Sequence, residues 1–251
     1  MNIARYQIKG NVFFGVVDND IVKQIKGSPF DRITFTSEET PLSKVKILSP
    51  FVPSKILAIA LNVKTHLHDR NAPTKPEPFY KVPSSVIGPG ETIILPREAG
   101  RVEEEAELVA VIGKKCSKVS KINAMDYVLG YTCGNDVSCR DWQKGDIQWW
   151  RAKSSDTFGP IGPYIVTDID PSNLNIVARV NGIVGQRCNT SELLFDLPTM
   201  ISFISQVVTL ERGDMIFTGT SGAPAQIRDG DFVEVEIEKI GLLSNPVKIE
   251  K

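Results

Sequence analysis

The chain has 251 residues, 41% of them hydrophobic, which is enough to build a sizeable core and argues against disorder. Its 29 basic and 30 acidic side chains nearly cancel, so we expect neither nucleic acid nor an anionic membrane as a partner. No stretch approaches the roughly 20 apolar residues that a membrane span needs, so we expect a soluble protein that is not exported.

The cysteines and histidines limit the kinds of metal site that the chain can build. Four cysteines lie far apart without a Cys-x-x-Cys pair, so we expect neither a zinc knot nor a disulfide framework, and a reducing cytoplasm is the simplest setting. The two histidines, His66 and His68, exclude any site that needs three imidazoles. A bound metal ion would therefore take mostly oxygen ligands.

The first 50 residues predict a small N-terminal β domain. Residues 12–17 and 21–25 flank an Asp-Asn-Asp turn, a pattern typical of a hairpin. Two prolines then precede the apolar run 56–61, which indicates a boundary followed by a buried strand. We therefore expect one domain over residues 1–50 and a catalytic domain over residues 51–251.

The next segments predict loops and strands. Four prolines between residues 71 and 83 favour an extended, mobile loop, which we interpret as a lid. Residues 86–96 read as a turn followed by a strand, and residues 105–113 as a strand rich in β-branched side chains. Ser120 is expected to cap a short helix through Tyr127, with Gly130 ending it.

The C-terminal half contains the clearest hairpin, at residues 177–184, because Asn181-Gly182 supplies the positive φ angles of a type I′ turn. Residues 197–210 repeat apolar side chains at helical spacing, with Pro198 at the first helical position. Strands are expected at 214–218 and 232–240. Because strands outnumber helices and do not alternate regularly with them, the sequence predicts a strand-rich α+β fold.

An acidic strand is the main sign of chemistry. Side chains two apart on a strand share a face, so Glu103, Glu105 and Glu107 are expected on one side, opposite apolar residues. Carboxylates so placed repel, and near an apolar interior they require a raised pKa or a cation. The alternative is a solvated charged face. Val109 and Val111 follow on the acidic face, so the far end of that face must be buried. Carboxylates next to a buried segment favour a bound cation over a solvated charged face.

A second acidic segment, GNDVSCRD, follows about 30 residues later and brings a further candidate, Asp136. We expect Asp136 to lie alongside the two glutamates. Three carboxylates without imidazole select a hard ion, so the predicted cofactor is Mg²⁺, or alternatively Mn²⁺ or Ca²⁺.

From Lys55 to its end, the chain resembles the fumarylacetoacetate hydrolase superfamily. The order and spacing of the following segments carry the resemblance: NVKTH, FYKVPSSVIGPG, EAELVAVIGK, AMDYVLGYTCGNDVSCRDWQ, QWWRAKSSDTFGPIGP, VNGIVGQRCNTSELLF and LERGDMIFTGT. The resemblance implies a fumarylacetoacetate hydrolase-type mixed β fold and a homodimer.

The resemblance also implies roles for particular residues. The family's metal carboxylates fall on the three residues that the charge argument selects, namely Glu105, Glu107 and Asp136. The implied catalytic residues are Lys153 and a proton-transfer dyad of His66 and Asp69. The implied substrate contacts are Lys81, Arg140, Gln143 and Thr220.

Three departures from the family pattern concern the substrate rim and the dyad. Val63 stands where an aromatic is usual, Asp69 stands where Glu is common, and residues 219–225 read GTSGAPA instead of Gly-Thr-Pro-x-Gly-Val-Gly. Asp is one methylene shorter than Glu, so the dyad is expected to be looser. Hydrolysis is therefore less strongly implied than metal binding.

The expected substrate is a small 2-oxo or 2-hydroxydienoate acid that reacts through an enolate. The segments most resemble 2-hydroxyhepta-2,4-diene-1,7-dioate isomerases of aromatic compound catabolism. Acylpyruvate or fumarylpyruvate hydrolysis and oxaloacetate decarboxylation are the alternatives within enzymes. A non-catalytic metal-binding module on the same scaffold is the alternative of another class.

Overall fold

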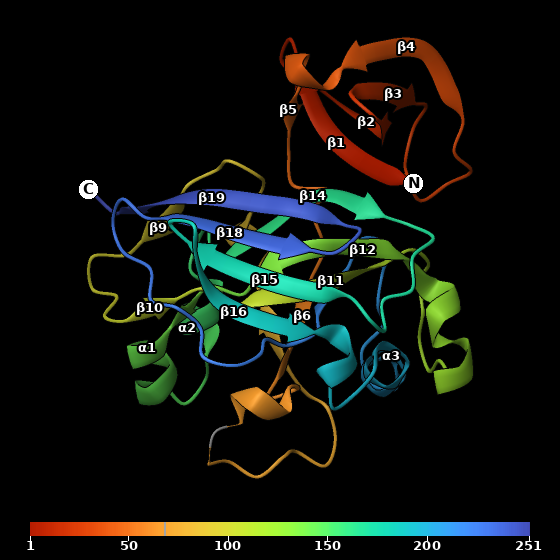
Figure 1. Ribbon diagram of the computed structural model, residues 1–251. Coiled ribbons are helices and arrows are strands. Elements are labelled where there is room, and N and C mark those ends of the chain that lie inside the picture. The colour runs from red at the N-terminus through yellow and green to blue at the C-terminus, as the bar shows by residue number, and fades with distance from the viewer. Residues whose placement is uncertain (68) are drawn as a thin grey trace.

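The structure is a computed structural model that describes residues 1–67 and 69–251, so the second histidine, His68, lies outside the described residues. Within these ranges, twelve strands form one large sheet (Figure 1). Ten lie side by side in the order β4 (Phe35–Pro41), β3 (Ile21–Ile25), β2 (Asn11–Asp18), β1 (Asn2–Ile8), β14 (Gly159–Val166), β12 (Val128–Asn135), β11 (Ala106–Ile112), β17 (Met215–Phe217), β6 (Ile56–Ala60) and β7 (Glu77–Lys81). The remaining two are β5 (Lys46–Ile47), beside β1, and β8 (Val86–Ile87), beside β14.

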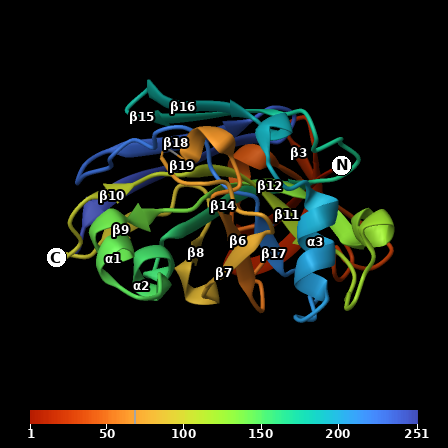
Figure 2. The ribbon, with the colours of Figure 1, turned by 90° about the horizontal axis from the view of Figure 1, so that it is seen from below.

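A second sheet of five strands lies over one face of the large sheet (Figure 2). Its order is β16 (Ile183–Asn189), β15 (Asn175–Val180), β18 (Phe232–Ile237), β19 (Gly241–Ile249) and β9 (Ile93–Leu95). Leu108 and Ala110 of β11 share a core cluster with Ala178, Val235 and Leu243 of this sheet. A short two-stranded ladder joins β10 (Val102–Glu103) to β13 (Ser138–Cys139).

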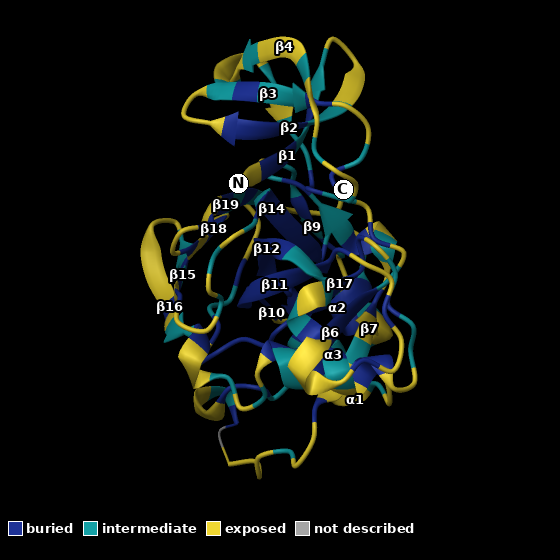
Figure 3. Cartoon of the chain, turned by 90° about the vertical axis from the view of Figure 1, so that its right-hand side faces the viewer, coloured by how far each residue is buried: buried dark blue, intermediate teal, exposed yellow. Residues whose placement is uncertain are grey.

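Strand β11 is buried on both faces (Figure 3). On the face opposite Leu108, Val109 and Val111 pack with Ile161 and Ile165 of β14 in a second core cluster. The two faces follow from the strand period of two, which sends successive side chains to opposite sides. The acidic residues at the start of β11 therefore stand at the end of a strand that is buried along its whole length.

Helices are few and short. The α-helices are α1 (Arg140–Gly145), α2 (Trp150–Ser154) and α3 (Leu197–Ser205). The 3₁₀ turns are η1 (Leu42–Lys44), η2 (Lys64–His66), η3 (Pro83–Ser85), η4 (Lys121–Tyr127) and η5 (Thr190–Glu192). This composition confirms the predicted strand-rich α+β fold. No helix in the described ranges has the length and apolar character that crossing a membrane requires.

The N-terminal strands stand at one end of the large sheet (Figure 1). They have a small core of their own, which includes Tyr6, Val17 and Val22. Strand β1 also pairs antiparallel with β14, with Ile3 opposite Ile165. The strands up to residue 50 are therefore hydrogen-bonded to the rest of the sheet, and the division at that residue stays a prediction.

Both predicted hairpins are present. Strands β2 and β3 pair antiparallel, as do β15 and β16. The turn of the second hairpin has φ of 53° at Asn181 and 77° at Gly182, as a type I′ turn requires. These turns were predictable because their chemistry is confined to two adjacent residues.

Three local predictions were wrong in part. The proline-rich stretch 71–83 contains strand β7, because Pro78 lies on the outermost strand, where a missing N–H breaks no ladder. The segment after Ser120 is a 3₁₀ turn, and Gly130 lies inside β12, where a Cβ would come within 2.5 Å of the Val166 carbonyl oxygen. Helix α3 stops at Ser205, and Val207 is 84% exposed.

Candidate active site

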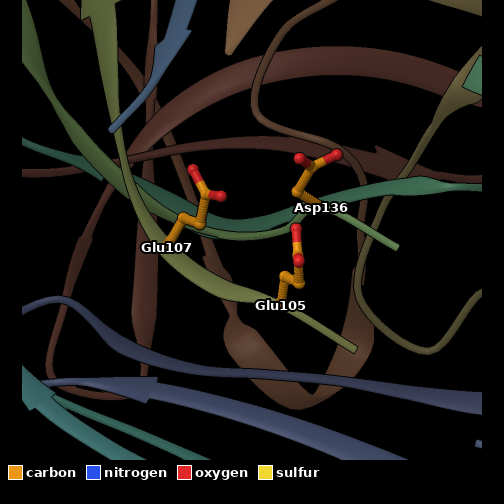
Figure 4. Close-up of side chains that lie close together, drawn as sticks. All are labelled: Glu105, Glu107 and Asp136. Atoms are coloured by element: carbon orange, nitrogen blue, oxygen red, sulfur yellow. The ribbon is translucent and has the colours of Figure 1, made fainter. Parts of the chain in front are cut away.

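Three buried carboxylates converge where β11 and β12 meet (Figure 4). Glu105, Glu107 and Asp136 each offer an oxygen, and these oxygens all lie within 4.8 Å of one another. Glu105 directly precedes β11, Glu107 lies in it, and Asp136 directly follows β12, its antiparallel partner. The Asp136 N–H donates to the Glu105 carbonyl oxygen at 2.8 Å and closes this end of the ladder. Strand pairing thus brings together residues that lie about 30 positions apart in the sequence.

Glu103 takes a different position from the one that a single strand would give it. The chain leaves β10 after Glu103 and enters β11 only at Ala106. Glu103 contacts Arg101 Nε and Arg140 Nε, each at 2.5 Å. It faces the same cavity as the other two glutamates, but arginines neutralise its charge and it stays outside the three-carboxylate cluster.

Two cations that line the cavity, Lys153 and Arg140, bind the cluster. Lys153 Nζ lies 2.5 Å from Glu105 Oε2 and 2.7 Å from Asp136 Oδ2. A terminal nitrogen of Arg140 donates to Glu105 Oε1 at 2.5 Å, and the other donates to Gln143 Oε1 at 2.9 Å. Lys153 and the three carboxylates are buried, and the Arg140 side chain is partly buried. These contacts are short and charge-assisted, so they orient the carboxylates strongly.

The two glutamates have opposite electrostatic environments. Burial would raise the pKa of Glu105, but the charges of Lys153 and Arg140 outweigh burial and hold this pKa below its ordinary value. Burial raises the pKa of Glu107 well above the ordinary value, and the charges of Asp136 and Glu105 raise it further. Glu107 Oε2 accepts one N–H bond, from Gly219 at 2.7 Å. A cation beside Glu107 would relieve this repulsion, so the donor set fits a hard divalent ion.

The cluster lines a cavity of about 690 Å³. Five other predicted site residues reach the same cavity, namely His66, Arg140, Gln143, Lys153 and Thr220. Phe79 and Trp149, in edge-to-face contact at 5.4 Å, form an aromatic wall, and Arg70, Arg101 and Lys144 add positive charge. The cavity therefore combines an acidic floor with a partly basic lining.

His66 is oriented by a backbone carbonyl. Its Nδ1 lies 2.9 Å from the Gly222 carbonyl oxygen, and its Nε2 lies 3.7 Å from Glu105 Oε1. A carbonyl oxygen can only accept, so Nδ1 carries the hydrogen and donates it, which leaves Nε2 able to take up a proton. Burial lowers the pKa of His66, an effect that the Glu105 charge opposes only in part. The ring is therefore mainly neutral near pH 7.

Two predicted site residues lie elsewhere than expected. Asp69 is exposed and does not line the cavity, and its predicted dyad with His66 stays a prediction. Lys81 is buried behind Asp136, which it contacts at 2.7 Å, and it does not line the cavity. Its family position suggested a substrate contact, but the ladder between β6 and β7 turns its side chain inward.

Thr220 reaches the cavity, but its hydroxyl group is already engaged. It donates to the Ala106 carbonyl oxygen at 3.0 Å and accepts from Gln186 Nε2 at 2.9 Å. Gln186 Oε1 in turn accepts from the Ala106 N–H at 3.0 Å. Gln186 thus ties the start of β11 to the segment that carries Thr220, a role that no local pattern in the sequence indicated.

The altered GTSGAPA segment contributes to the site through its backbone. Gly219 N–H binds Glu107, the Gly222 carbonyl binds His66, and Ala225 N–H donates to Glu104 Oε1 at 3.0 Å. Backbone contacts do not depend on which side chains the segment carries. Its departure from the family pattern therefore leaves these three contacts in place. Glu104, fully buried beneath this segment, was missed because it reads as one more residue of an acidic run.

Comparison with known proteins gives the family. The family described as Fumarylacetoacetate (FAA) hydrolase C-terminal matches residues 55–248, and the one described as Rv2993c-like, N-terminal matches residues 1–50. The crystal structure of 5-carboxymethyl-2-hydroxymuconate delta-isomerase from Mycobacterium smegmatis has a TM-score of 0.95 and 42% identity, and the similarity covers 100% of both chains.

Two further relatives have other activities in their names. Mitochondrial oxaloacetate tautomerase fahd2 of Xenopus laevis is 42% identical over 220 residues, which are 82% of this chain and 69% of that protein. Maleylpyruvate hydrolase from Sphingobium sp. SYK-6, solved with manganese(II) ion and pyruvate, has a TM-score of 0.83 and 29% identity over 100% of both chains. The resemblance seen in the sequence motifs is confirmed. The chain belongs to the fumarylacetoacetate hydrolase family, whose members include isomerases, tautomerases and hydrolases.

Proposed function

We propose that this protein is a divalent-metal-dependent isomerase or tautomerase that moves a proton at the carbon next to the carbonyl group of a small 2-oxo acid. The observation that carries the proposal is the placement of His66. Its Nε2 faces the acidic cluster at 3.7 Å from Glu105, and its Nδ1 is fixed by the Gly222 carbonyl. A partly buried, neutral imidazole held in one tautomer beside an ion site is a suitable general base.

The residues that would hold the ion are Glu105, Glu107 and Asp136. Their oxygen donors suit Mg²⁺ or Mn²⁺, with Ca²⁺ as the alternative. A bound divalent ion would supply positive charge that stabilises the negative charge developing on the substrate's carbonyl oxygen. The maleylpyruvate hydrolase structure with manganese(II) and pyruvate, itself a 2-oxo acid, supports this assignment.

The chain's own cations would bind and orient the substrate. Lys153 places a second positive charge beside Glu105 and Asp136, where an enolate oxygen would need it. Each terminal nitrogen of Arg140 carries two hydrogens, and one hydrogen on each is used for Glu105 or Gln143. The second hydrogens would hold a substrate carboxylate, for which the guanidinium fork is well shaped.

Proton transfer at carbon is favoured over hydrolysis by what supports His66. A carboxylate behind a catalytic histidine stabilises the imidazolium that forms when water is activated. Here Nδ1 lies 2.9 Å from the Gly222 carbonyl oxygen, which carries no net charge. C–C bond hydrolysis remains the second candidate, because the similarity to maleylpyruvate hydrolase covers the whole chain.

The test is metal-dependent hydrogen–deuterium exchange at C3 of 2-oxo acids in D₂O, followed by NMR. The panel comprises pyruvate, oxaloacetate, an acylpyruvate and 2-hydroxyhepta-2,4-diene-1,7-dioate, each with chelated enzyme and with Mg²⁺ or Mn²⁺ restored. Exchange or a shifted double bond supports the proposal. Cleavage to pyruvate and an acid would assign a hydrolase instead, and loss of carbon dioxide a decarboxylase. If none of the four compounds underwent a metal-dependent reaction, the result would favour the alternative of a non-catalytic metal-binding module.

The proposal includes a homodimer in the cytoplasm, as the family resemblance implies. Light scattering coupled to size-exclusion chromatography measures the mass directly. A mass near 28 kDa, the value for one chain, would refute the dimer.

A further inference from the structure

Lys81 carries a buried ammonium group that does not reach the cavity. It is the last residue of edge strand β7, and its side chain is 0% exposed. Its Nζ contacts Asp136 Oδ1 at 2.7 Å, the Phe158 carbonyl oxygen at 3.1 Å and the Lys153 carbonyl oxygen. The three hydrogens of the ammonium group thus meet three acceptors, which leaves none for a substrate.

We infer that Lys81 is a positioning residue of the active site, which holds Asp136 and the backbone of Lys153 in one fixed arrangement. This inference rests on the proposed function, because it takes Glu105, Glu107 and Asp136 as the residues that hold the ion. It assigns Lys81 to the support of an ion ligand and removes it from the substrate contacts.

The first part of this role concerns the orientation of Asp136. Lys81 binds Oδ1 and Lys153 binds Oδ2, each at 2.7 Å. With an ammonium group on each oxygen, the carboxylate cannot rotate without breaking a charge-assisted bond. Lys153 lines the cavity and Lys81 does not, so Lys81 fixes the rear oxygen and determines which oxygen faces Glu105. Groups that orient ligands in this way commonly tune metal affinity.

The second part concerns Lys153. It lies near the end of helix α2, where carbonyl groups have no partner within the helix. The Lys81 ammonium binds the Lys153 carbonyl oxygen. Beside it, Ser154 Oγ accepts from Val82 N–H at 3.3 Å and donates to the Tyr80 carbonyl oxygen at 3.4 Å. Strand β7 and helix α2 are therefore joined around Lys81, which places the Lys153 side chain relative to Asp136.

Lysine suits this position for a geometric reason. The three acceptors lie around a single nitrogen, as the tetrahedral ammonium group requires. Arginine would present a larger planar fork, with its donors spread over three nitrogens. A neutral side chain of similar length, such as methionine, removes all three hydrogen bonds and leaves the volume nearly unchanged.

The experiment compares wild-type protein with Lys81→Met, using Mn²⁺ as the probe. Calorimetry on chelator-treated protein should show a 10- to 100-fold weaker affinity for Mn²⁺, the usual effect of losing a group that orients a metal ligand. With saturating Mn²⁺, kcat should fall while KM stays near the wild-type value, because Lys81 does not touch the substrate. A raised KM with unchanged Mn²⁺ affinity would overturn the inference and restore a substrate contact.

Lys55→Met is the matched control. Lys55 Nζ also pairs with a fully buried aspartate, Asp214, at 2.5 Å, and neither residue lines the cavity. This variant should lose stability and keep its Mn²⁺ affinity. An equal loss of Mn²⁺ affinity in both variants would mean that general destabilisation explains the effect.

Lys81→Met leaves the buried charge of Asp136 without one of its partners, so this variant could fail to fold. A second variant keeps the inference testable in that case. Addition of Asp136→Asn to Lys81→Met should restore a cooperative melting transition if the two residues act as a pair. A double variant less stable than either single variant would refute the pairing. If wild-type protein bound no Mn²⁺, the proposed metal site would be refuted. The melting temperatures of the single and double variants would still test whether Lys81 and Asp136 act as a pair.

Discussion

Replacement of Glu105 by glutamine removes a buried negative charge that two cations share. Glu105 lies 2.5 Å from both Lys153 Nζ and Arg140, and its side chain is only 3% exposed. Loss of one partner from a buried ion pair costs about 3–5 kcal/mol. The glutamine oxygen still accepts one hydrogen bond, so we take the lower end, about 3 kcal/mol. For a chain of this length the metal-free protein should melt roughly 6–12 °C lower.

The pH dependence of this loss has a defined sign. The charges of Lys153 and Arg140 hold the pKa of Glu105 below its ordinary value of 4.5 in the folded protein. Its stabilising contribution is therefore complete above pH 4.5 and declines as the pH falls further. The difference in melting temperature between wild type and Glu105→Gln should be full at pH 7 and shrink in acid.

The assay is calorimetric melting in excess chelator across this pH range, with metal-dependent activity measured in parallel. Glu236→Gln is the control, because its pair with Arg179 at 2.7 Å is half-exposed and worth about 0–1 kcal/mol. Glu105→Gln should also abolish metal-dependent activity. An unchanged melting temperature would mean that the ion pairs contribute nothing, and unchanged activity at saturating metal would refute the ligand assignment.

Three other predictions concern the base, a buried acid and the ion. His66→Ala should slow proton transfer by about 10²–10⁴-fold with Mn²⁺ affinity nearly unaltered; a large loss of affinity in calorimetry would make the histidine a ligand. Because burial lowers the pKa of His66, the acid limb of kcat/KM should lie below pH 6.5, and a limb above that value would contradict the assignment. Burial raises the pKa of Glu104 from 4.5 to about 7, so its carboxyl group costs about 3 kcal/mol of stability as pH rises from 4.5 through 7. Glu104→Gln should therefore melt higher than wild type at pH 8 but not at pH 4, and equal melting at pH 8 would show that Glu104 ionises without cost. Treatment with EDTA should abolish activity and added Mg²⁺ or Mn²⁺ should restore it; activity that survives complete removal of metal, verified by elemental analysis, would exclude metal dependence.

Local sequence patterns predicted much of the architecture. Alternation along β11 correctly separated Leu108 and Ala110 from Val109 and Val111, because strand geometry alone sends neighbouring side chains to opposite faces. The Asn181-Gly182 turn was predictable because its backbone requirement falls on two adjacent residues. Family motifs, read in order, indicated which acidic residues would meet.

The roles of single side chains depended on contacts between distant segments. The family resemblance paired Asp69 with His66, a pairing that stays a prediction, and the structure adds the Gly222 carbonyl, 156 residues further on, as a partner of His66 Nδ1. Lys81 was placed at the substrate by its motif, but pairing of β7 with β6 buries it behind Asp136. Local hydrophobic periodicity predicts neither contact, because the partners of His66 and Lys81 come from other elements.

The sequence by itself therefore determined the strand-rich fold and the acidic residues that gather at the start of β11, from which the proposed hard ion follows. Only the tertiary structure decided which cation neutralises which carboxylate, which atom orients His66, and which lysine faces the cavity. The physical reason is that side-chain alternation is a property of one strand, whereas hydrogen bonds and ion pairs at the site join strands and loops that only the folded chain brings within reach.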